Sequence, residues 1–310
     1  MRLIASRTWR IAGWVAGVAI IVIAVRQLVA GWSDIADRPL QWRIQPLLLL
    51  LAVLAVWAMY ALLIQAWRTM LAAWGGELPL GTAARIWTVS SLGKYLPGKL
   101  WAIAGMAVMA RRAGIAPWAA AGSAVILQAL AIGTGAAITG MFGSQALAAH
   151  YPWVRVLLPL LALASALGVT LLLWPRFVRR LLRVARVDAP ATVPGPAVVA
   201  AGAVANLVAW CGYGAAFWLL GHGLLELPGL TIGRAITAFA ASYVAGLLFL
   251  PAPGGIGVRE SVILLMLGGP LGAPAASALA VASRLLLTLT ELGAAAPFLI
   301  LNRERLGAES

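Results

Sequence analysis

The sequence predicts an all-α polytopic membrane protein, an inverted repeat of helices in which each half carries a broken, re-entrant helix pair at a Pro-Gly motif. Three observations support this fold class: the composition, the length of the apolar segments and two interruptions at corresponding positions. Of the 310 residues, 63% are hydrophobic and 10% are charged, and the mean hydropathy is +0.95. Soluble globular domains are far more polar, so we expect residues 1–310 to form a single transmembrane domain.

Six apolar segments are long enough to cross a membrane, since a helix needs about 20 apolar residues to do so. The first follows three arginines, as in a signal peptide, but it is longer than usual and no clear cleavage site follows, so we expect an uncleaved span. The six segments are Ile11–Ala30, Leu47–Ala66, Ala119–Met141, Val154–Trp174, Ala197–Leu220 and Ala275–Leu301.

Two further segments are interrupted. Residues 84–112 are cut by Leu96-Pro97-Gly98, and residues 232–267 are cut by a Pro-Ala-Pro-Gly-Gly run at 251–255. The arms of the first, about a dozen residues each, are too short to cross the membrane at a rise of about 1.5 Å per residue. Each segment could be one interrupted crossing or a hairpin that returns to the same side. The arm 232–250 is also long enough to span if tilted.

The distribution of arginine favours two hairpins. Cytoplasmic loops of membrane proteins collect Lys and Arg, and only two hairpins place the five arginines of the loop 176–186 on the same side as the other basic flanks. This topology puts both termini on the cytoplasmic side of the membrane, which we expect to be a bacterial plasma (inner) membrane. It also divides the chain into two repeats, residues 8–141 and 154–301. Because each repeat crosses three times, the second is inverted relative to the first, as in alternating-access transporters.

The net charge of +14 does not indicate a nucleic-acid-binding protein. The basic residues flank apolar spans and form no continuous soluble patch, so they fit a face that borders anionic lipid.

Both lysines of the chain flank the first interruption. Placing a cation at the bilayer centre costs about 2.5 to 3.5 kcal/mol, so Lys94 and Lys99 need an anion or a water-filled cavity. Pro97 disfavours helix before it, and Gly98 lets the chain turn. The following helical arm would then present free backbone N–H groups, which are a natural site for phosphate.

The second interruption repeats this pattern. Its glycines allow close approach of the backbone to a ligand, and Arg259 falls in the first turn of the next arm. Glu260 is a candidate partner for Lys94, Lys99 or Arg259, or a carrier of a coupling proton. On the last span, Arg284 and Glu291 lie seven residues apart and so share a face, where they either pair or line the cavity.

We therefore predict a substrate-binding site from both interruptions and the last span. The alternative is that the breaks are helix ends at the interface, with Lys and Arg reaching the headgroups. The sequence has no acidic pair and no histidine within a span, so we expect no catalytic residues, no metal and no cofactor. The candidate site residues are Lys94, Tyr95, Pro97, Gly98, Lys99, Pro253, Gly254, Gly255, Gly257, Arg259, Glu260, Arg284 and Glu291.

The segments 91–99 (SLGKYLPGK) and 253–260 (PGGIGVRE) resemble the two signatures of the lysylphosphatidylglycerol synthase transmembrane family, also called flippase-like membrane proteins. The likeness covers nearly the whole chain. In the best-known members, this membrane domain is joined to a cytoplasmic synthase and translocates the aminoacylated phosphatidylglycerol that the synthase makes. Only about ten residues follow the last predicted span, so the resemblance implies a stand-alone membrane domain. Stand-alone relatives are associated with polyprenyl-phosphate sugars, glycolipids, hopanoids and phospholipids.

The residues and the resemblance together predict a flippase-like transporter. It would move an anionic or amphiphilic lipid, such as a phospholipid, an aminoacylated phospholipid or a polyprenyl-phosphate glycolipid, between leaflets. We expect its partners to be membrane lipids with phosphate-bearing headgroups, and a separately encoded lipid-biosynthesis enzyme is a further candidate partner. The alternatives are a membrane-embedded lipid-modifying transferase and a non-transporting partner of such an enzyme.

Overall fold

The computed structural model describes residues 40, 42–95, 101–143, 152–184, 193–249 and 252–307, with side chains up to residue 300. The predicted span Ile11–Ala30 and the site residues Pro97, Gly98 and Lys99 lie outside these ranges. The described part is helical, with one isolated β-bridge between Trp42 and Leu225.

Four of the helices begin with a proline at their first position, where its missing N–H costs no intrahelical hydrogen bond. The α-helices and 3-10 turns (η) are α2 Pro46–Ala72, α3 Leu80–Ser91, η1 Leu92–Tyr95, α4 Trp101–Arg112, α5 Pro117–Phe142, α7 Val154–Leu172, α8 Pro175–Val184, α9 Pro196–Leu224, α10 Ile232–Leu248, η2 Pro253–Gly255, α11 Val258–Leu271 and α12 Ala273–Gly307.

Six helical stretches of the described chain are long and apolar enough to cross a membrane, so the prediction of a multi-pass membrane protein is confirmed. Five of them, α2, α5, α7, α9 and α12, coincide with predicted spans. The sixth, Pro253–Leu271, joins η2 to α11 across positive φ angles at Gly254 (57°) and Gly257 (82°). Its continuous helix is only 14 residues, or about 21 Å, against a hydrocarbon core of about 30 Å.

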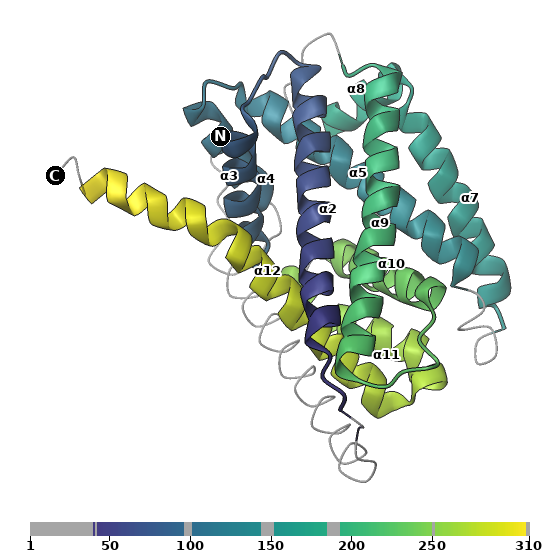
Figure 1. Cartoon of the computed structure of the whole chain (residues 1–310). Helices are drawn as coiled ribbons and strands as arrows, with labels where there is room; N and C mark the ends of the chain where they lie inside the picture. The colour runs from purple at the N-terminus through teal and green to yellow at the C-terminus, as the bar shows by residue number, and fades with distance from the viewer. Residues whose placement is uncertain are drawn as a thin grey trace, which may run out of the picture.

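Two long helices form the middle of the molecule. α2 and α9 lie side by side (Figure 1). They are antiparallel, because the chain entering α2 hydrogen-bonds to the end of α9, from the Gln45 N–H to the Gly223 carbonyl over 2.8 Å. α5 packs against α7 on one side of this pair, and α12 crosses below it toward the C-terminus (Figure 1).

The two interrupted segments approach the middle from opposite ends. In Figure 1, α3 and α4 lie side by side at the upper left, while α10 and α11 lie in the lower part of the molecule. η1 follows α3 and contacts α4, and η2 precedes α11. η1 also contacts η2. The interruptions therefore bring residues about 160 positions apart into contact.

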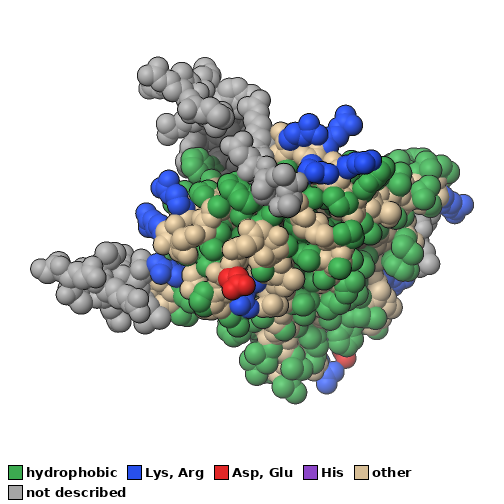
Figure 2. Space-filling model, turned by 90° about the horizontal axis from the view of Figure 1, so that it is seen from above, with side chains coloured by type: hydrophobic (Ala, Val, Ile, Leu, Met, Phe, Trp, Pro, Cys, Tyr) green, Lys and Arg blue, Asp and Glu red, His purple; other side chains and the backbone are tan. Residues whose placement is uncertain are grey.

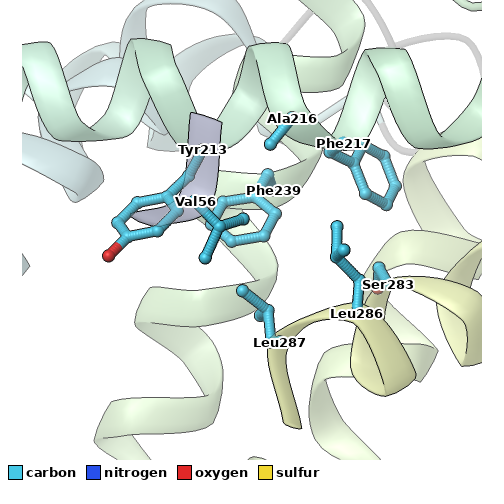
Figure 3. Close-up of a pocket in the computed structure, with 8 residues that line it drawn as sticks. All are labelled: Val56, Tyr213, Ala216, Phe217, Phe239, Ser283, Leu286 and Leu287. Carbon is cyan, nitrogen blue, oxygen red and sulfur yellow. The ribbon is translucent and has the colours of Figure 1, made fainter. Parts of the chain in front are cut away.

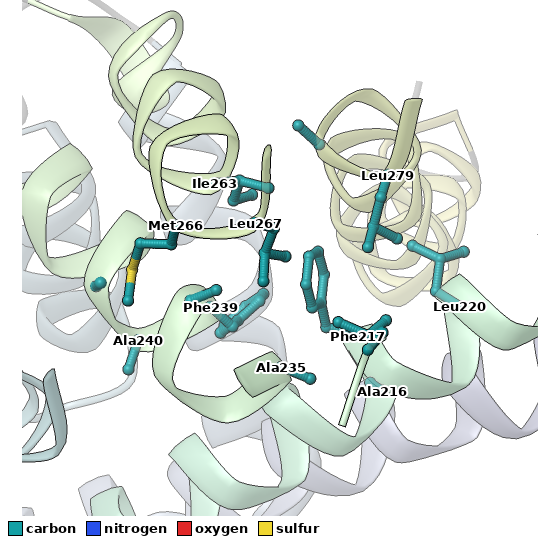
Figure 4. Packing of buried hydrophobic residues seen from close by; sticks show 14 of the residues in the cluster. Ala216, Phe217, Leu220, Ala235, Phe239, Ala240, Ile263, Met266, Leu267 and Leu279 are labelled. Atoms are coloured by element: carbon teal, nitrogen blue, oxygen red, sulfur yellow. The ribbon is translucent and has the colours of Figure 1, made fainter. Parts of the chain in front are cut away.

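The larger of two buried apolar clusters surrounds the second interrupted segment. Phe217 of α9, Phe239 of α10, Leu267 of α11 and Leu279 of α12 are each at most 2% exposed and pack together (Figure 4). The outer surface is apolar as well, most clearly on α7, where Val156, Leu157, Leu160, Leu163 and Leu167 are exposed. An apolar exterior of this extent suits lipid rather than water.

Basic side chains gather at the end of the molecule where α4 ends and α8 lies. Figure 2 views this end and shows Lys and Arg side chains spread around it. On α8, Val178 and Leu182 are fully buried against the protein. Its arginines point outward, and these exposed residues are Arg176, Arg179, Arg180 and Arg183.

The close packing of α5 on α7 yields a first prediction. A Cβ atom on Gly140 would lie 2.5 Å from the Ala162 nitrogen and from the Leu158 carbonyl oxygen, both of them backbone atoms. We expect Gly140→Ala to destabilise the fold by about 1 to 3 kcal/mol, because backbone atoms cannot move aside as a side chain can. Unfolding in detergent micelles, followed as a function of denaturant, measures the change.

The control for this prediction is Gly168→Ala on α7. No atom lies within 4 Å of its Cβ position, and alanine favours helix over glycine by up to about 1 kcal/mol. Equal stabilities for the two variants would show that α5 and α7 do not pack as described.

Candidate functional site

Tight backbone packing at η1 and η2 positions the candidate site. A Cβ atom on Gly93 would lie 2.8 Å from the Ala102 nitrogen, so glycine is required where η1 meets the start of α4. In η2, Gly254 and Gly255 have positive φ angles of 57° and 70°, which other residues rarely adopt. A Cβ on Gly254 would lie 3.4 Å from the Tyr95 ring. The two turns are thus in direct contact.

The first ion pair joins η1 to α12. The Lys94 ammonium group donates a hydrogen bond to Oε1 of Glu291, which is only 7% exposed. The Tyr95 hydroxyl donates to Oε2 of Glu291 over 2.8 Å, and the Tyr60 hydroxyl of α2 donates to Oε1 over 3.3 Å. One buried carboxylate therefore accepts hydrogen bonds from one cation and two neutral hydroxyls.

The second ion pair joins α12 to α11. Arg284 Nη1 donates to Oε1 of Glu260 over 2.8 Å. The other oxygen, Oε2, accepts the backbone N–H of Gly257 over 2.7 Å, which is the capping-box geometry at the start of a helix. Arg284 also lies 3.4 Å from the Gly254 carbonyl oxygen. α12 thus contacts both interruptions through oppositely charged side chains two turns apart.

Arg259 is a buried cation of a different kind. It is 8% exposed, and its guanidinium carbon lies 4.7 Å from the ring centre of Tyr243 and 5.6 Å from that of Phe239. Its Nε atom is buried without a hydrogen-bond partner, and no Asp or Glu of the described chain forms an ion pair with it. Cation–π contacts contribute about 0.5 to 2 kcal/mol each, which is small beside the cost of burying an uncompensated charge.

Glycine makes room for the stem of Arg259. A Cβ atom on Gly246 of α10 would lie 2.7 Å from Arg259 Cγ, and one on Gly255 would lie 3.2 Å from it. The sequence motif therefore folds so that η2 and α10 close around this side chain.

A pair of matching contacts connects the two halves of the chain. The Trp57 indole of α2 donates to the Thr290 carbonyl of α12 over 3.1 Å, and the Trp210 indole of α9 donates to the Thr134 hydroxyl of α5 over the same distance. The Thr134 hydroxyl donates to the Leu130 carbonyl, and the Thr290 hydroxyl donates to the Leu286 carbonyl, four residues earlier in each case.

Tyrosines occupy the crossing of α2 and α9. The rings of Tyr60 and Tyr213 pack edge to face with centroids 6.2 Å apart. Sequence reasoning missed Trp57, Tyr60, Trp210 and Tyr213. A Trp-x-x-Tyr pattern, which occurs at 57–60 in α2 and at 210–213 in α9, could have indicated them. Tyr243 and Thr288, which also contact the site, carried no comparable sequence pattern.

A narrow apolar pocket lies beside this crossing (Figure 3). It is too small to admit a water molecule. The ion-paired residues Lys94, Glu291, Glu260 and Arg284 are not among the residues that line it. The lining residues are Val56, Tyr213, Ala216, Phe217, Phe239, Ser283, Leu286 and Leu287.

The structure thus brings Lys94, Tyr95, Gly254 and Glu260 into one cluster with Arg284 and Glu291 of α12. Arg259 lies next to this cluster. Two details differ from the alternatives that the sequence left open. Glu260 pairs with Arg284 rather than with Lys94 or Arg259, and Arg284 and Glu291 pair with other residues rather than with each other. Among the described residues, no group of His, Cys, Asp and Glu could hold a metal ion.

No model of a known protein family matches the chain, and no curated protein matches it either. Fold and site therefore define it by class, as a multi-pass α-helical membrane protein in which two interrupted segments meet at partly buried, ion-paired charges.

Proposed function

We propose that this protein is a flippase-like lipid transporter of the family that its two motifs resemble. It binds the phosphate-bearing headgroup of an anionic or amphiphilic lipid between two inverted repeats and exposes it alternately to the two leaflets. The observation that carries the proposal is Arg259, a cation at least nine-tenths buried that has no carboxylate partner in the described chain. A buried charge of this kind needs a counter-ion.

The reciprocal contacts support the inverted repeat. Two-fold symmetry makes each contact between the halves occur twice. If a residue of the first half contacts a residue of the second, then its equivalent in the second half contacts the equivalent residue of the first. Trp57 and Trp210 each reach the threonine of the opposite half, and Tyr60 packs on Tyr213 as residues on an axis do. The antiparallel packing of α2 and α9 fits the same axis.

The interrupted segments support two re-entrant hairpins. α3 and α4 pack on each other, α10 packs on α11, and the turns of the two pairs meet. α3, α4 and α11 have 12, 12 and 14 residues, fewer than a full span needs, and α10, with 17, is at the lower limit. On this proposal, the basic end with α8 faces the cytoplasm of the inner membrane, in line with the positive-inside rule.

The headgroup would bind between the turns. Lys94 and Arg259, with Lys99 from the interrupted stretch, would hold its phosphate, and the positive φ angles at η2 would let the backbone approach it. The ion pairs on α12 hold both turns in place while the site is empty. The lipid tails would remain in the bilayer during transport.

Lipid flipping in reconstituted vesicles tests the proposal. A fluorescent phosphatidylglycerol whose outer-leaflet copies are quenched from outside reports movement between leaflets. We expect wild type to equilibrate the leaflets, and Arg259→Gln to slow flipping by at least about tenfold, equivalent to about 1.4 kcal/mol of lost interaction. Native mass spectrometry of the purified protein should show a co-purifying lipid that is lost in Lys94→Ala/Lys99→Ala.

The matched control is Arg43→Gln, since Arg43 is an exposed arginine in a surface ion pair with Glu226, and it should flip as wild type does. A covalently changed lipid would favour a transferase. The proposal would be contradicted if lipid flipped no faster in vesicles with wild-type protein than in protein-free vesicles, and if the purified protein held no lipid. That result would favour a non-transporting partner.

A further inference from the structure

We infer that Glu291 is a proton-binding group that takes up a proton when an anionic headgroup binds, so that each headgroup is transported together with one proton. This inference rests on the proposed function and adds the source of energy. It follows from what happens to Glu291 when its cation is needed elsewhere.

Among the described residues, three groups bond to Glu291, and one of them is charged. Lys94 supplies the positive charge, while Tyr95 and Tyr60 donate neutral hydroxyls. Among the described residues, the other titratable groups that interact with the pair are Tyr213 of α9, Tyr243 of α10 and Arg259 of α11. Arg259 in turn lies near Glu260 and Arg284, which pair with each other.

Neither arginine is available to replace Lys94. Arg284 is engaged by Glu260 over 2.8 Å, and Arg259 lacks an anionic partner in the described chain, so it would be taken by the headgroup. Among the described residues, Lys94 is therefore the one cation that forms an ion pair with Glu291.

Headgroup binding removes that support. If Lys94 turns to the phosphate, Glu291 is left as a buried carboxylate with two hydroxyls and a second anion nearby. Burial and a neighbouring like charge both favour the protonated form of a carboxyl group. A proton from solvent neutralises Glu291, and its carboxyl group can still accept from Tyr60 and Tyr95. The site thus alternates between a Lys94–Glu291 pair and a Lys94–phosphate pair with protonated Glu291.

Glu260 is not the proton-binding group. One of its oxygens accepts the Gly257 N–H in the first turn of α11, which remains in place whatever binds nearby. Its other oxygen accepts from Arg284 over 2.8 Å, so both oxygens of Glu260 keep their partners when Lys94 moves.

The pH dependence of lipid binding tests the inference. The full chain is placed in nanodiscs of zwitterionic lipid, and a short-chain phosphatidylglycerol is the probe, since its phosphodiester keeps one negative charge across the neutral range. The complex holds one proton more than the free protein, so affinity must rise as pH falls, by about tenfold per pH unit while free Glu291 is ionised.

We expect Glu291→Gln to bind the probe with an affinity that does not change with pH and that equals the low-pH affinity of wild type. Glutamine keeps the shape and the neutrality of the protonated acid, with one oxygen that accepts hydrogen bonds. Glu226→Gln, at an exposed carboxylate paired with Arg43, should keep the wild-type slope. A slope that persists in Glu291→Gln, or that is lost only in Glu260→Gln, would overturn the inference.

A second measurement needs no variant. Calorimetric titration of wild type in two buffers of different ionisation enthalpy gives the number of protons taken up, and we expect about one per probe molecule bound. Binding without proton uptake would refute the role of Glu291 and leave the transport proposal standing. Absence of probe binding at every pH would refute the transport proposal itself.

Discussion

Replacing Arg259 with methionine is expected to stabilise the empty protein and to abolish headgroup binding. The change removes a cation that is 8% exposed and unpaired in the described chain, and it keeps an unbranched side chain in the space beside Gly246 and Gly255. Losing the two cation–π contacts costs about 0.5 to 2 kcal/mol each, while the desolvation penalty of a buried ion is several kcal/mol. We therefore expect a net gain of roughly 1 to 4 kcal/mol.

Denaturant unfolding in micelles measures the stability of this variant, and native mass spectrometry detects bound lipid. Opposite changes in stability and binding are typical of a residue kept for function at a cost to the fold. The control is Arg43→Met, at a side chain that is 65% exposed, which should change stability by less than about 1 kcal/mol. A clear loss of stability in Arg259→Met would mean that Arg259 has a structural partner and would weaken the case for an anion site.

Replacing Glu291 with leucine should have the largest destabilising effect. Removing one member of a buried ion pair leaves the other uncompensated, at a cost of about 3 to 5 kcal/mol. The single change Glu291→Leu leaves Lys94 without its carboxylate and also removes the acceptor for Tyr95 and Tyr60. The double change Lys94→Met/Glu291→Leu should recover most of that loss, because an apolar pair needs no compensation.

A double-mutant cycle in micelles gives the coupling energy of this pair. The matched cycle uses Arg43 and Glu226, which pair over 3.0 Å on the surface at 65% and 58% exposure. We expect a coupling of less than about 1 kcal/mol there. Similar values for the two cycles would mean that water screens the pair and reaches Glu291, contrary to its 7% exposure.

The proposed repeat is symmetric in its packing and asymmetric in its chemistry. The residue after Thr290 is Glu291, whereas the residue after Thr134 is Gly135. A Cβ atom on Gly135 would lie 2.7 Å from a Val244 methyl group and 2.8 Å from the Trp210 ring, so apolar contacts fill the place that ion pairs occupy on α12. Opening toward one side would therefore break charged contacts, and opening toward the other would break apolar ones.

The sequence alone determined the class of protein and the position of most spans. An apolar run of sufficient length requires a helix in lipid wherever its neighbours lie, so α2, α5, α7, α9 and α12 could be predicted from length and composition. The same local reasoning identified Lys94 and Arg259, because a cation beside a Pro-Gly break in an apolar segment is conspicuous in one dimension.

Only the tertiary structure decided which charges meet. Glu291 pairs with Lys94, 197 positions away, and Glu260 pairs with Arg284 rather than with its neighbour Arg259. Tyr60 joins the site from the middle of a span that looked purely apolar. Ion pairs depend on distances of a few ångströms, and these are set by how the helices pack around one another, which the pattern of any one segment does not contain.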